Sequence, residues 1–236
     1  MDNAERLTSA AREVAVMRAR IGADADLRRW SMAVKHWQAQ RLAATHYDLL
    51  HEPRFRQAAR FFLDDLYGAK DFSMRDAELA RVIPKLARTL PDSALATLAD
   101  AVELDAMSER LDEEIALRLR RDDAESISES GYAAAYRAVA PRADREHQLD
   151  LVLAIGRSLD RLVRHPLIGT LLAAMGGPAR LAGLGAMHEF LLAGFRAFKD
   201  IGGASEFLAR IDQRERVILD RLYGGAQRGW TIVSSP

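Results

Sequence analysis

Helical periodicity runs through almost all of the 236 residues, and it constrains the fold more than any other feature of the sequence. Apolar side chains recur at intervals of three and four residues. No stretch shows the sustained alternation of β-branched residues that marks a half-buried strand. Ala, Leu, Arg and Glu dominate the segments, and these residues favour helices. The sequence therefore predicts an all-α protein, and it excludes the phosphate-binding glycine loops that follow a strand.

Glycine and proline divide the chain at positions that are typical of helix ends. Asp24 or Asp26 is a suitable N-cap for the second helix. The expected helices cover residues 4–21, 24–50, 53–67, 73–88, 91–121, 131–139, 143–164, 167–175, 178–202 and 205–223. This pattern, with a loop at 122–130, predicts one compact domain over residues 1–236 with roughly eight to ten helices. The tail at 226–236 is also expected to be irregular, with Trp230, Ile232 and Val233 packing it onto the body.

Charge and composition narrow the possible functions. The 34 Lys and Arg residues balance 34 Asp and Glu residues, so general nucleic-acid binding is not expected. The absence of cysteine removes thiolate nucleophiles, iron–sulfur clusters and Cys-ligated zinc. Charge is nevertheless distributed unevenly along the chain. Residues 1–60 form a basic block with 11 basic and 7 acidic residues, and residues 99–129 form an acidic block with 4 basic and 11 acidic residues. We expect these blocks to be solvated helix faces that meet within the fold, or surfaces that dock onto a subunit or partner.

Targeting and membrane signals are absent from the sequence. The first 20 residues carry too many charges for a signal peptide. The longest uncharged apolar run, residues 166–179, has 14 residues and contains Gly176, Gly177 and Pro178. A membrane span needs about 20 residues without such breaks. The sequence therefore predicts no membrane span and a cytoplasmic location.

The most distinctive segment reads Phe61-Phe62-Leu63-Asp64-Asp65-Leu66-Tyr67-Gly68. It resembles the Phe-Phe-Leu-Glu-Glu-Leu-Tyr-Gly motif of a family of uncharacterised bacterial helical proteins, with Asp in place of both Glu residues. Residues 70–76, 165–167 and 178–180 also look like this family, so the similarity covers most of the chain. The family has no established activity, and the resemblance implies a helical fold without implying a mechanism.

Two hypotheses describe the acidic residues of this motif. On a helix, Phe62 and Leu66 share one apolar face, and Asp65 lies at its edge. Asp64 points away from that face toward solvent. Both aspartates can pair with nearby arginines and so support a buried core helix. Alternatively, Asp65 and Asp71 form a metal or acid–base site, because carboxylates serve both chemistries.

His188 lies within a strongly apolar segment. It occupies one position of a seam with intervals of three and four residues, formed by Leu181, Leu184, His188, Leu191, Phe195 and Phe198. A helix this apolar is expected to lie centrally in the fold or at a subunit interface. His188 either forms a core hydrogen bond with a backbone carbonyl or carboxylate, or serves as an axial ligand for haem or another cofactor in a pocket.

Familiar catalytic patterns are absent. The sequence contains no His-Glu-x-x-His, Glu-x-x-His or Gly-x-Ser-x-Gly. The leading hypothesis is therefore a non-enzymatic binding protein that forms a homodimer through the helix of residues 181–198 or through a stripe formed by Trp30 and Trp37. One alternative is a haem- or small-molecule-binding protein that uses His188. The other alternative is a carboxylate–metal enzyme that uses Asp65 and Asp71.

Overall fold

The computed structural model describes residues 2–64, the backbone at 65 and 66, and residues 78, 81–84, 91–122 and 126–231. Every regular element within these ranges is a helix, which confirms the predicted all-α fold. The helices are α1 (Asn3–Ala23), α2 (Ala25–Thr45), α3 (Tyr47–His51), α4 (Arg56–Arg60), the π-helix η1 (Phe61–Leu66), α6 (Asp92–Arg121), α7 (Glu129–Val139), α8 (Arg142–Leu162), α9 (Pro166–Ala174), α10 (Gly176–Leu181), α11 (Gly185–Ile201) and α12 (Ser205–Tyr223). None of the described helices is at once long enough and apolar enough to traverse a bilayer.

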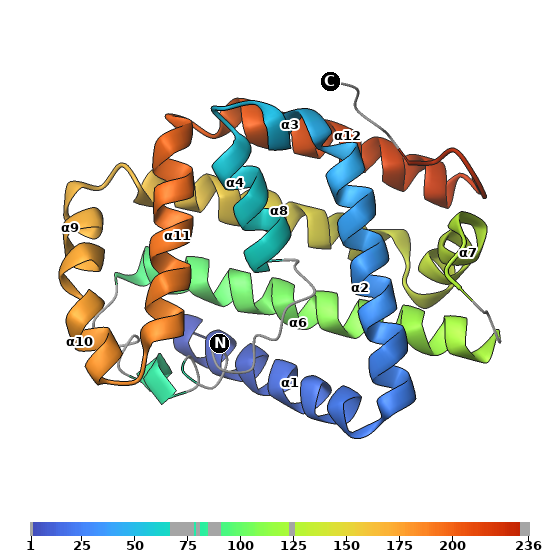
Figure 1. Ribbon diagram of the computed structural model, residues 1–236, viewed down its shortest axis with the longest axis horizontal. Helices are drawn as coiled ribbons and strands as arrows, with labels where there is room; N and C mark the ends of the chain where they lie inside the picture. Colours follow the sequence, from blue (N-terminus) through green and yellow to red (C-terminus); the bar gives the residue numbers. More distant parts are fainter. Residues whose placement is uncertain (1, 67–77, 79–80, 85–90, 123–125, 232–236) are drawn as a thin grey trace.

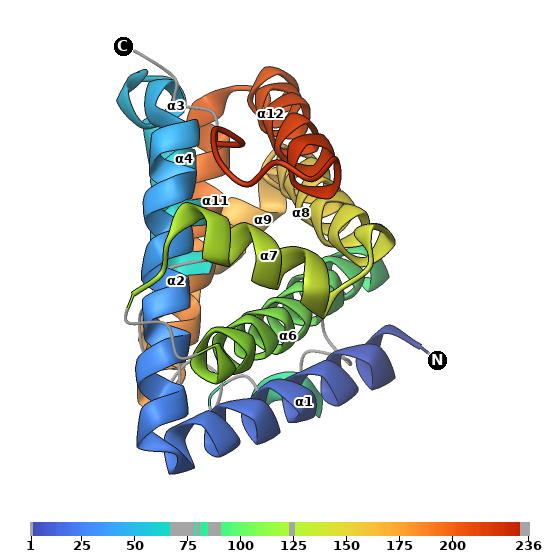
Figure 2. The ribbon, with the colours of Figure 1, turned by 90° about the vertical axis from the view of Figure 1, so that its right-hand side faces the viewer.

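The helices form two crossed layers. In one layer α1, α6, α8 and α12 lie side by side, with α6 between α1 and α8 (Figure 1). In the other layer α2 and α11 run across the first, with α4 between them (Figure 1), and the turned view in Figure 2 shows α2 standing on one side of the stack. α9 and α10 lie outside α11 at one edge of the molecule (Figure 1). The 30-residue α6 is the central element, because it contacts α1, α2, α7 and α8.

Local signals account for the start of several helices. Asp2 accepts a hydrogen bond from the backbone N–H of Glu5, and the Glu5 side chain accepts one from the backbone N–H of Asp2. Asp24 caps α2 by accepting hydrogen bonds from the backbone N–H groups at 26 and 27, as the sequence predicts. Ser128 caps α7 in the same way. These side chains pair backbone donors that the first turn of a helix leaves without partners.

The basic N-terminal block and the acidic α6 meet inside the fold. Nη2 of Arg18 lies 2.8 Å from Oδ1 of Asp105. Arg20 pairs with Glu113, which is buried. The two blocks therefore neutralise each other where α1 contacts α6. This agrees with the expectation that the blocks meet within the fold.

Three predicted helices differ in extent from the observed ones. α2 ends at Thr45 rather than near residue 50, and α3 begins after a break at His46. The helix expected from residue 53 begins as α4 at Arg56 and continues as the π-helix η1. The helix expected over residues 178–202 is divided into α10 and α11 at Gly183, where φ is 66°. Glycine adopts this left-handed conformation without the steric cost of a Cβ atom.

The expected seam around His188 is interrupted by this division. Leu181 ends α10 and is 93% exposed, whereas His188 and Phe198 are buried in α11. Because the chain turns at Gly183, Leu181 cannot continue the surface that α11 buries. The buried face of α11 consists instead of Met187, His188, Gly194, Ala197, Phe198 and Ile201.

The apolar core contains two clusters that border the site described below. One cluster includes Phe62 and Phe207 and gathers side chains from α4, η1, α8, α11 and α12. The other includes Trp30, Tyr132 and Trp230. Trp230 is fully buried, so the tail packs onto the body at this residue as predicted, whereas Ile232 and Val233 lie outside the described residues.

Candidate functional site

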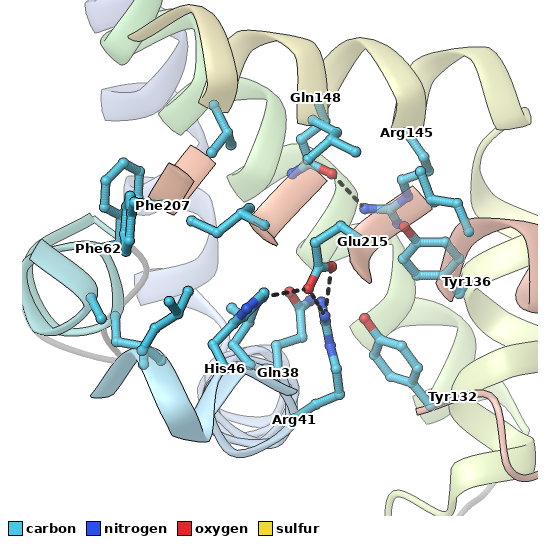
Figure 3. Close-up of a pocket in the computed structure, with 18 residues that line it drawn as sticks. Gln38, Arg41, His46, Phe62, Tyr132, Tyr136, Arg145, Gln148, Phe207 and Glu215 are labelled. Carbon is cyan, nitrogen blue, oxygen red and sulfur yellow. Dashed lines mark hydrogen bonds and ion pairs between the residues drawn. The ribbon is translucent and has the colours of Figure 1, made fainter. Parts of the chain in front are cut away.

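A cavity of about 120 Å³ lies where these two clusters meet (Figure 3). Polar side chains from α2, α7, α8 and α12 gather on one side of it, and aromatic and aliphatic side chains gather on the other (Figure 3). Helical spacing brings both kinds of residue to the same place. On α12, for example, Phe207, Ile211 and Glu215 follow one another at intervals of four and share one face.

An ion-pair network of Arg41, His46 and Glu215 forms one wall of the cavity (Figure 3). Nη1 of Arg41 lies 2.6 Å from each carboxylate oxygen of Glu215, and Nε2 of His46 lies 2.9 Å from Oε1. Burial opposes the ionisation of Glu215, but the charge of Arg41 and the hydrogen bond with His46 outweigh it and lower the pKa to about 2. Glu215 is therefore ionised at neutral pH and neutralises Arg41.

Arg145 also lines the cavity, from the first turn of α8, but no carboxylate pairs with it within the described residues. The residue is only 3% exposed. Its Nη1 donates a hydrogen bond to Oε1 of Gln148 at 3.2 Å, and its Cζ lies 4.0 Å from the ring centroid of Tyr136. Nε and Nη2 have no hydrogen-bond partner in the part of the chain that the structure describes. A buried cation with two free donors is costly unless an anion accepts them.

Two tyrosines from α7 contribute hydroxyl groups to the polar side. Burial raises the pKa of Tyr136 to about 12, although the charge of Arg145 opposes this effect, and burial raises the pKa of Tyr132 as well. Both hydroxyls are therefore neutral and able to donate hydrogen bonds at physiological pH. The ring of Tyr132 stacks on Trp37 with centroids 4.0 Å apart, which fixes its position.

Behind the polar side lies the buried carboxyl group of Asp112 on α6. It accepts a hydrogen bond from Nε2 of Gln38, which lines the cavity. Burial raises the pKa of Asp112 to about 6, and the charges of Lys35 and Arg145 act in the opposite direction. Among the described contacts, however, no hydrogen bond or ion pair joins Asp112 to Arg145. Asp112 therefore balances the charge of Arg145 only from a distance.

The apolar side of the cavity includes two residues of the distinctive motif, Phe62 and Leu63. The ring of Phe62 packs against those of Phe198 and Phe207, with centroids 5.9 Å apart in both pairs. Aliphatic side chains of α8 and α12 complete this side. The cavity thus offers a cation and neutral donors on one side and an apolar surface on the other, which suits a small molecule with an anionic group and an apolar body.

Among the residues that the sequence singles out, Phe62 and Leu63 line this cavity, whereas His188 lies apart from it. Nε2 of His188 lies 2.8 Å from the carbonyl oxygen of Leu172 and His188 does not line the cavity, so it adopts the first of its two predicted arrangements, a core hydrogen bond to a backbone carbonyl. Haem ligation by His188 stays a prediction. In the motif, Phe61 and Phe62 are buried and Asp64 is exposed.

The predicted carboxylate site falls outside the described residues. The side chains of Asp65 and Leu66, together with Tyr67, Gly68 and Asp71, are not among them. A metal or acid–base role for Asp65 and Asp71 therefore stays a prediction. Within the described part of the chain, no three His, Asp or Glu side chains are grouped so that they could hold a metal ion.

Sequence reasoning misses Arg145 and Glu215, although each leaves a signal. Glu215 interrupts an apolar stripe on its helix, between Ile211 and Leu219 at intervals of four. Arg145 precedes Leu149 and Val152 on the buried face of α8. A charged residue on a buried face indicates either an internal ion pair or a ligand site. Only the structure shows that Glu215 forms an ion pair and that Arg145 has no carboxylate partner among the described residues.

A family model described as a domain of unknown function (DUF8198) matches residues 17–229, a range that includes every residue lining the cavity. No curated protein matches the chain, and no solved structure matches it.

Proposed function

We propose that this chain, which belongs to the family described as a domain of unknown function (DUF8198), is a non-enzymatic binding protein whose ligand is a small organic acid. In this proposal the carboxylate of the ligand binds at Arg145. Its apolar body occupies the side of the cavity lined by Phe62 and Phe207. In this proposal the motif contributes to a wall of the binding site through Phe62 and Leu63.

The unpaired side of Arg145 is the observation that carries the proposal. Nε and Nη2 of an arginine present parallel N–H groups, a fork that matches the two oxygens of a carboxylate. Both atoms lack a partner in the described chain. Glu215 is already engaged by Arg41 and His46, so it does not serve as that partner. A bound anion supplies the missing acceptors and offsets the cost of burying the charge.

The volume of the cavity limits the size of the ligand. An apolar cavity of about 150 Å³ holds a benzene molecule, and the cavity here measures about 120 Å³. The cavity is partly open, so a single aryl ring or a short alkyl chain with one carboxylate is near the upper limit of size. Such a ligand matches the division of the lining into a polar and an apolar side. Benzoate and hexanoate are suitable probes of the two types.

Isothermal titration calorimetry with benzoate tests the proposal. We expect the protein to bind benzoate more tightly than benzamide, which has a similar shape and no charge. We expect Arg145→Met to weaken benzoate binding by more than tenfold, since a hydrogen bond to a charged group contributes about 1.5–3 kcal/mol. The matched control is Arg157→Met, on the same helix but exposed, which should bind benzoate as the parent does.

Unfolding of the ligand-free variant separates a binding role from a structural one. Methionine is apolar and has a similar length, so replacing an unpaired buried cation with it should leave the free energy of unfolding unchanged or raise it by about 1 kcal/mol. Equal affinity of the parent and Arg145→Met for benzoate contradicts the proposal. So does a loss of about 3 kcal/mol or more in the ligand-free variant, because Arg145 would then support the fold.

The remaining predictions from the sequence have separate tests. A Soret band after addition of haemin would support His188 as a ligand, and metal analysis addresses Asp65 and Asp71. Sedimentation velocity addresses the predicted homodimer. The proposed binding role depends on none of these, and the cytoplasmic location also stays a prediction.

A further inference from the structure

α9 and α10 lie at one edge of the molecule (Figure 1), and both carry exposed apolar side chains. On α9 and at its C-cap, Leu167, Leu171 and Met175 are 69%, 54% and 42% exposed. Their intervals of four place them on one side of the helix. Leu181 at the end of α10 is also exposed. Single exposed leucines are common on protein surfaces, but a group of exposed apolar side chains on neighbouring helices is typical of an interaction surface. We call these four residues the α9–α10 patch.

The opposite side of α9 is fixed against α11. The carbonyl of Leu172 accepts a hydrogen bond from His188, as described above. At Gly169 the two helices are so close that a Cβ atom would lie 2.9 Å from Cζ of Phe195. Because these contacts set the orientation of α9, the α9–α10 patch cannot turn inward. Within the part of the chain that the structure describes, the patch therefore stays exposed.

In the segment that contains α9 and α10, residues 161–188, all the charged side chains are positive. Residues 161–188 contain no Asp or Glu, although the chain has 34 of them. The segment contains Arg161, Arg164 and Arg180, all exposed. Arg164 pairs with Asp160, and in the described chain the other two have no ion pair with a carboxylate. An apolar stripe beside arginines is the pattern of a helix that lies at the surface of a membrane with acidic lipids.

We propose that α9 and α10 dock the protein onto the surface of an anionic lipid bilayer. The α9–α10 patch enters the boundary between headgroups and acyl chains, and the arginines face the lipid phosphates. A bilayer suits this surface because residues 166–179 offer a single side-chain hydrogen-bonding group, the hydroxyl of Thr170, which donates to the carbonyl of Pro166. Protein interfaces usually add a set of directed hydrogen bonds.

A second copy of the chain fits this surface less well. A two-fold interface would place the patch of one copy against that of the other. It would then bring arginines toward arginines, with no carboxylate in residues 161–188 to separate them. Asp105 and Glu109 of the acidic α6 are not available as partners for them, because both already pair with Arg18. The distribution of charge therefore favours anionic lipid.

Cosedimentation with sucrose-loaded vesicles tests the inference. We expect the protein to bind vesicles that contain phosphatidylglycerol and phosphatidylcholine at low salt, to bind pure phosphatidylcholine weakly, and to dissociate at about 1 M salt. The double variant Leu167→Glu/Leu171→Glu should lose more than tenfold in partition coefficient. The variant Arg161→Gln/Arg180→Gln should lose about thirtyfold on anionic vesicles, since each basic residue near such a surface contributes about 1 kcal/mol.

Val16→Glu is the matched control, because Val16 is 62% exposed on α1 and should not affect the partition. Circular dichroism checks that each variant folds, which is expected for exposed positions. Failure of the parent to bind anionic vesicles at low salt overturns the proposal, and so does unchanged binding by Leu167→Glu/Leu171→Glu. A dimer of the parent that this variant abolishes in sedimentation velocity also overturns it, because a second copy would then cover the patch.

Discussion

Two carboxyl groups near the cavity have pKa values displaced in opposite directions. Glu215 lies between Arg41 and His46, and its pKa falls to about 2 despite burial. Asp112 has the amide of Gln38 as its hydrogen-bond partner, and burial raises its pKa to about 6. An ionised carboxylate therefore stabilises the fold at Glu215 and destabilises it at Asp112, because the charges beside the two groups differ.

Asp112 gives a pH-dependent prediction. A raised pKa means that Asp112 binds its proton more tightly in the folded state than in the unfolded state. The stability gained from this protonation is complete below about pH 3.8 and is lost as the pH rises to about 6. A pKa difference of about two corresponds to about 3 kcal/mol. We predict that Asp112→Asn raises the free energy of unfolding by up to about 3 kcal/mol near neutral pH, and that the gain disappears below about pH 4.

Urea denaturation of parent and variant across this pH range measures the effect. Asp150→Asn serves as the control, because Asp150 also lies on a helix but is exposed and paired with Arg216. We expect no gain in stability for this control at any pH. A gain for Asp112→Asn that is equal at acidic and neutral pH would contradict the raised pKa.

At the scale of the element, local capping signals mark the starts of α1, α2 and α7. Asp24 begins α2 through a cap that the sequence predicts at either Asp24 or Asp26. The break at Gly183 is less evident from the sequence, because isolated glycines also occur inside helices. The first turn of α11 is capped from a distance: Oε2 of Glu78 accepts a hydrogen bond from the backbone N–H of Met187 at 2.8 Å. No local pattern reveals a cap that lies more than a hundred residues away, so the single helix expected over residues 178–202 is wrong.

The contact between α11 and η1 gives a prediction for Gly194. A Cβ atom at this position would lie 2.7 Å from Cζ of Phe61. Phe61 is buried and packs on the ring of Phe190 with centroids 5.4 Å apart, so it has little room to move. Alanine gains about 1 kcal/mol over glycine inside a helix, but overpacking costs about 1–3 kcal/mol. We predict that Gly194→Ala lowers the midpoint of thermal unfolding.

Gly22→Ala is the matched control, since Gly22 lies in α1 with nothing near its Cβ position. This variant should raise the midpoint through helix propensity alone. Circular dichroism during heating records both midpoints. If Gly194→Ala also raises the midpoint, α11 and η1 do not pack as closely as the structure has them.

At the scale of the whole molecule, the cavity exists only once distant segments have assembled. Arg41, Arg145 and Glu215 come from three helices that are far apart in the sequence. The sequence shows that each helix has an apolar face, which is why the all-α class could be predicted. Which faces meet depends on many weak apolar contacts between remote elements, so the cavity could not be predicted.

The C-terminal tail takes part in this assembly through Trp230. Its ring stacks on that of Tyr132, which lines the cavity, with centroids 5.7 Å apart. The backbone N–H of Gly229 donates a hydrogen bond to Glu129 at 2.9 Å and holds the tail on α7. We predict that Trp230→Ala lowers the free energy of unfolding by about 3–5 kcal/mol, the usual loss for a large buried aromatic residue. It should also weaken benzoate binding, because Tyr132 loses its support.

Urea denaturation and calorimetry with benzoate, at a temperature where both proteins are folded, measure the two effects of Trp230→Ala. Arg228→Ala is the control, because Arg228 is exposed in the same tail and should change neither quantity. Unchanged stability of Trp230→Ala would mean that the tail is not part of the core. Reduced stability with unchanged benzoate affinity would mean that Trp230 supports the fold without positioning Tyr132 for the ligand.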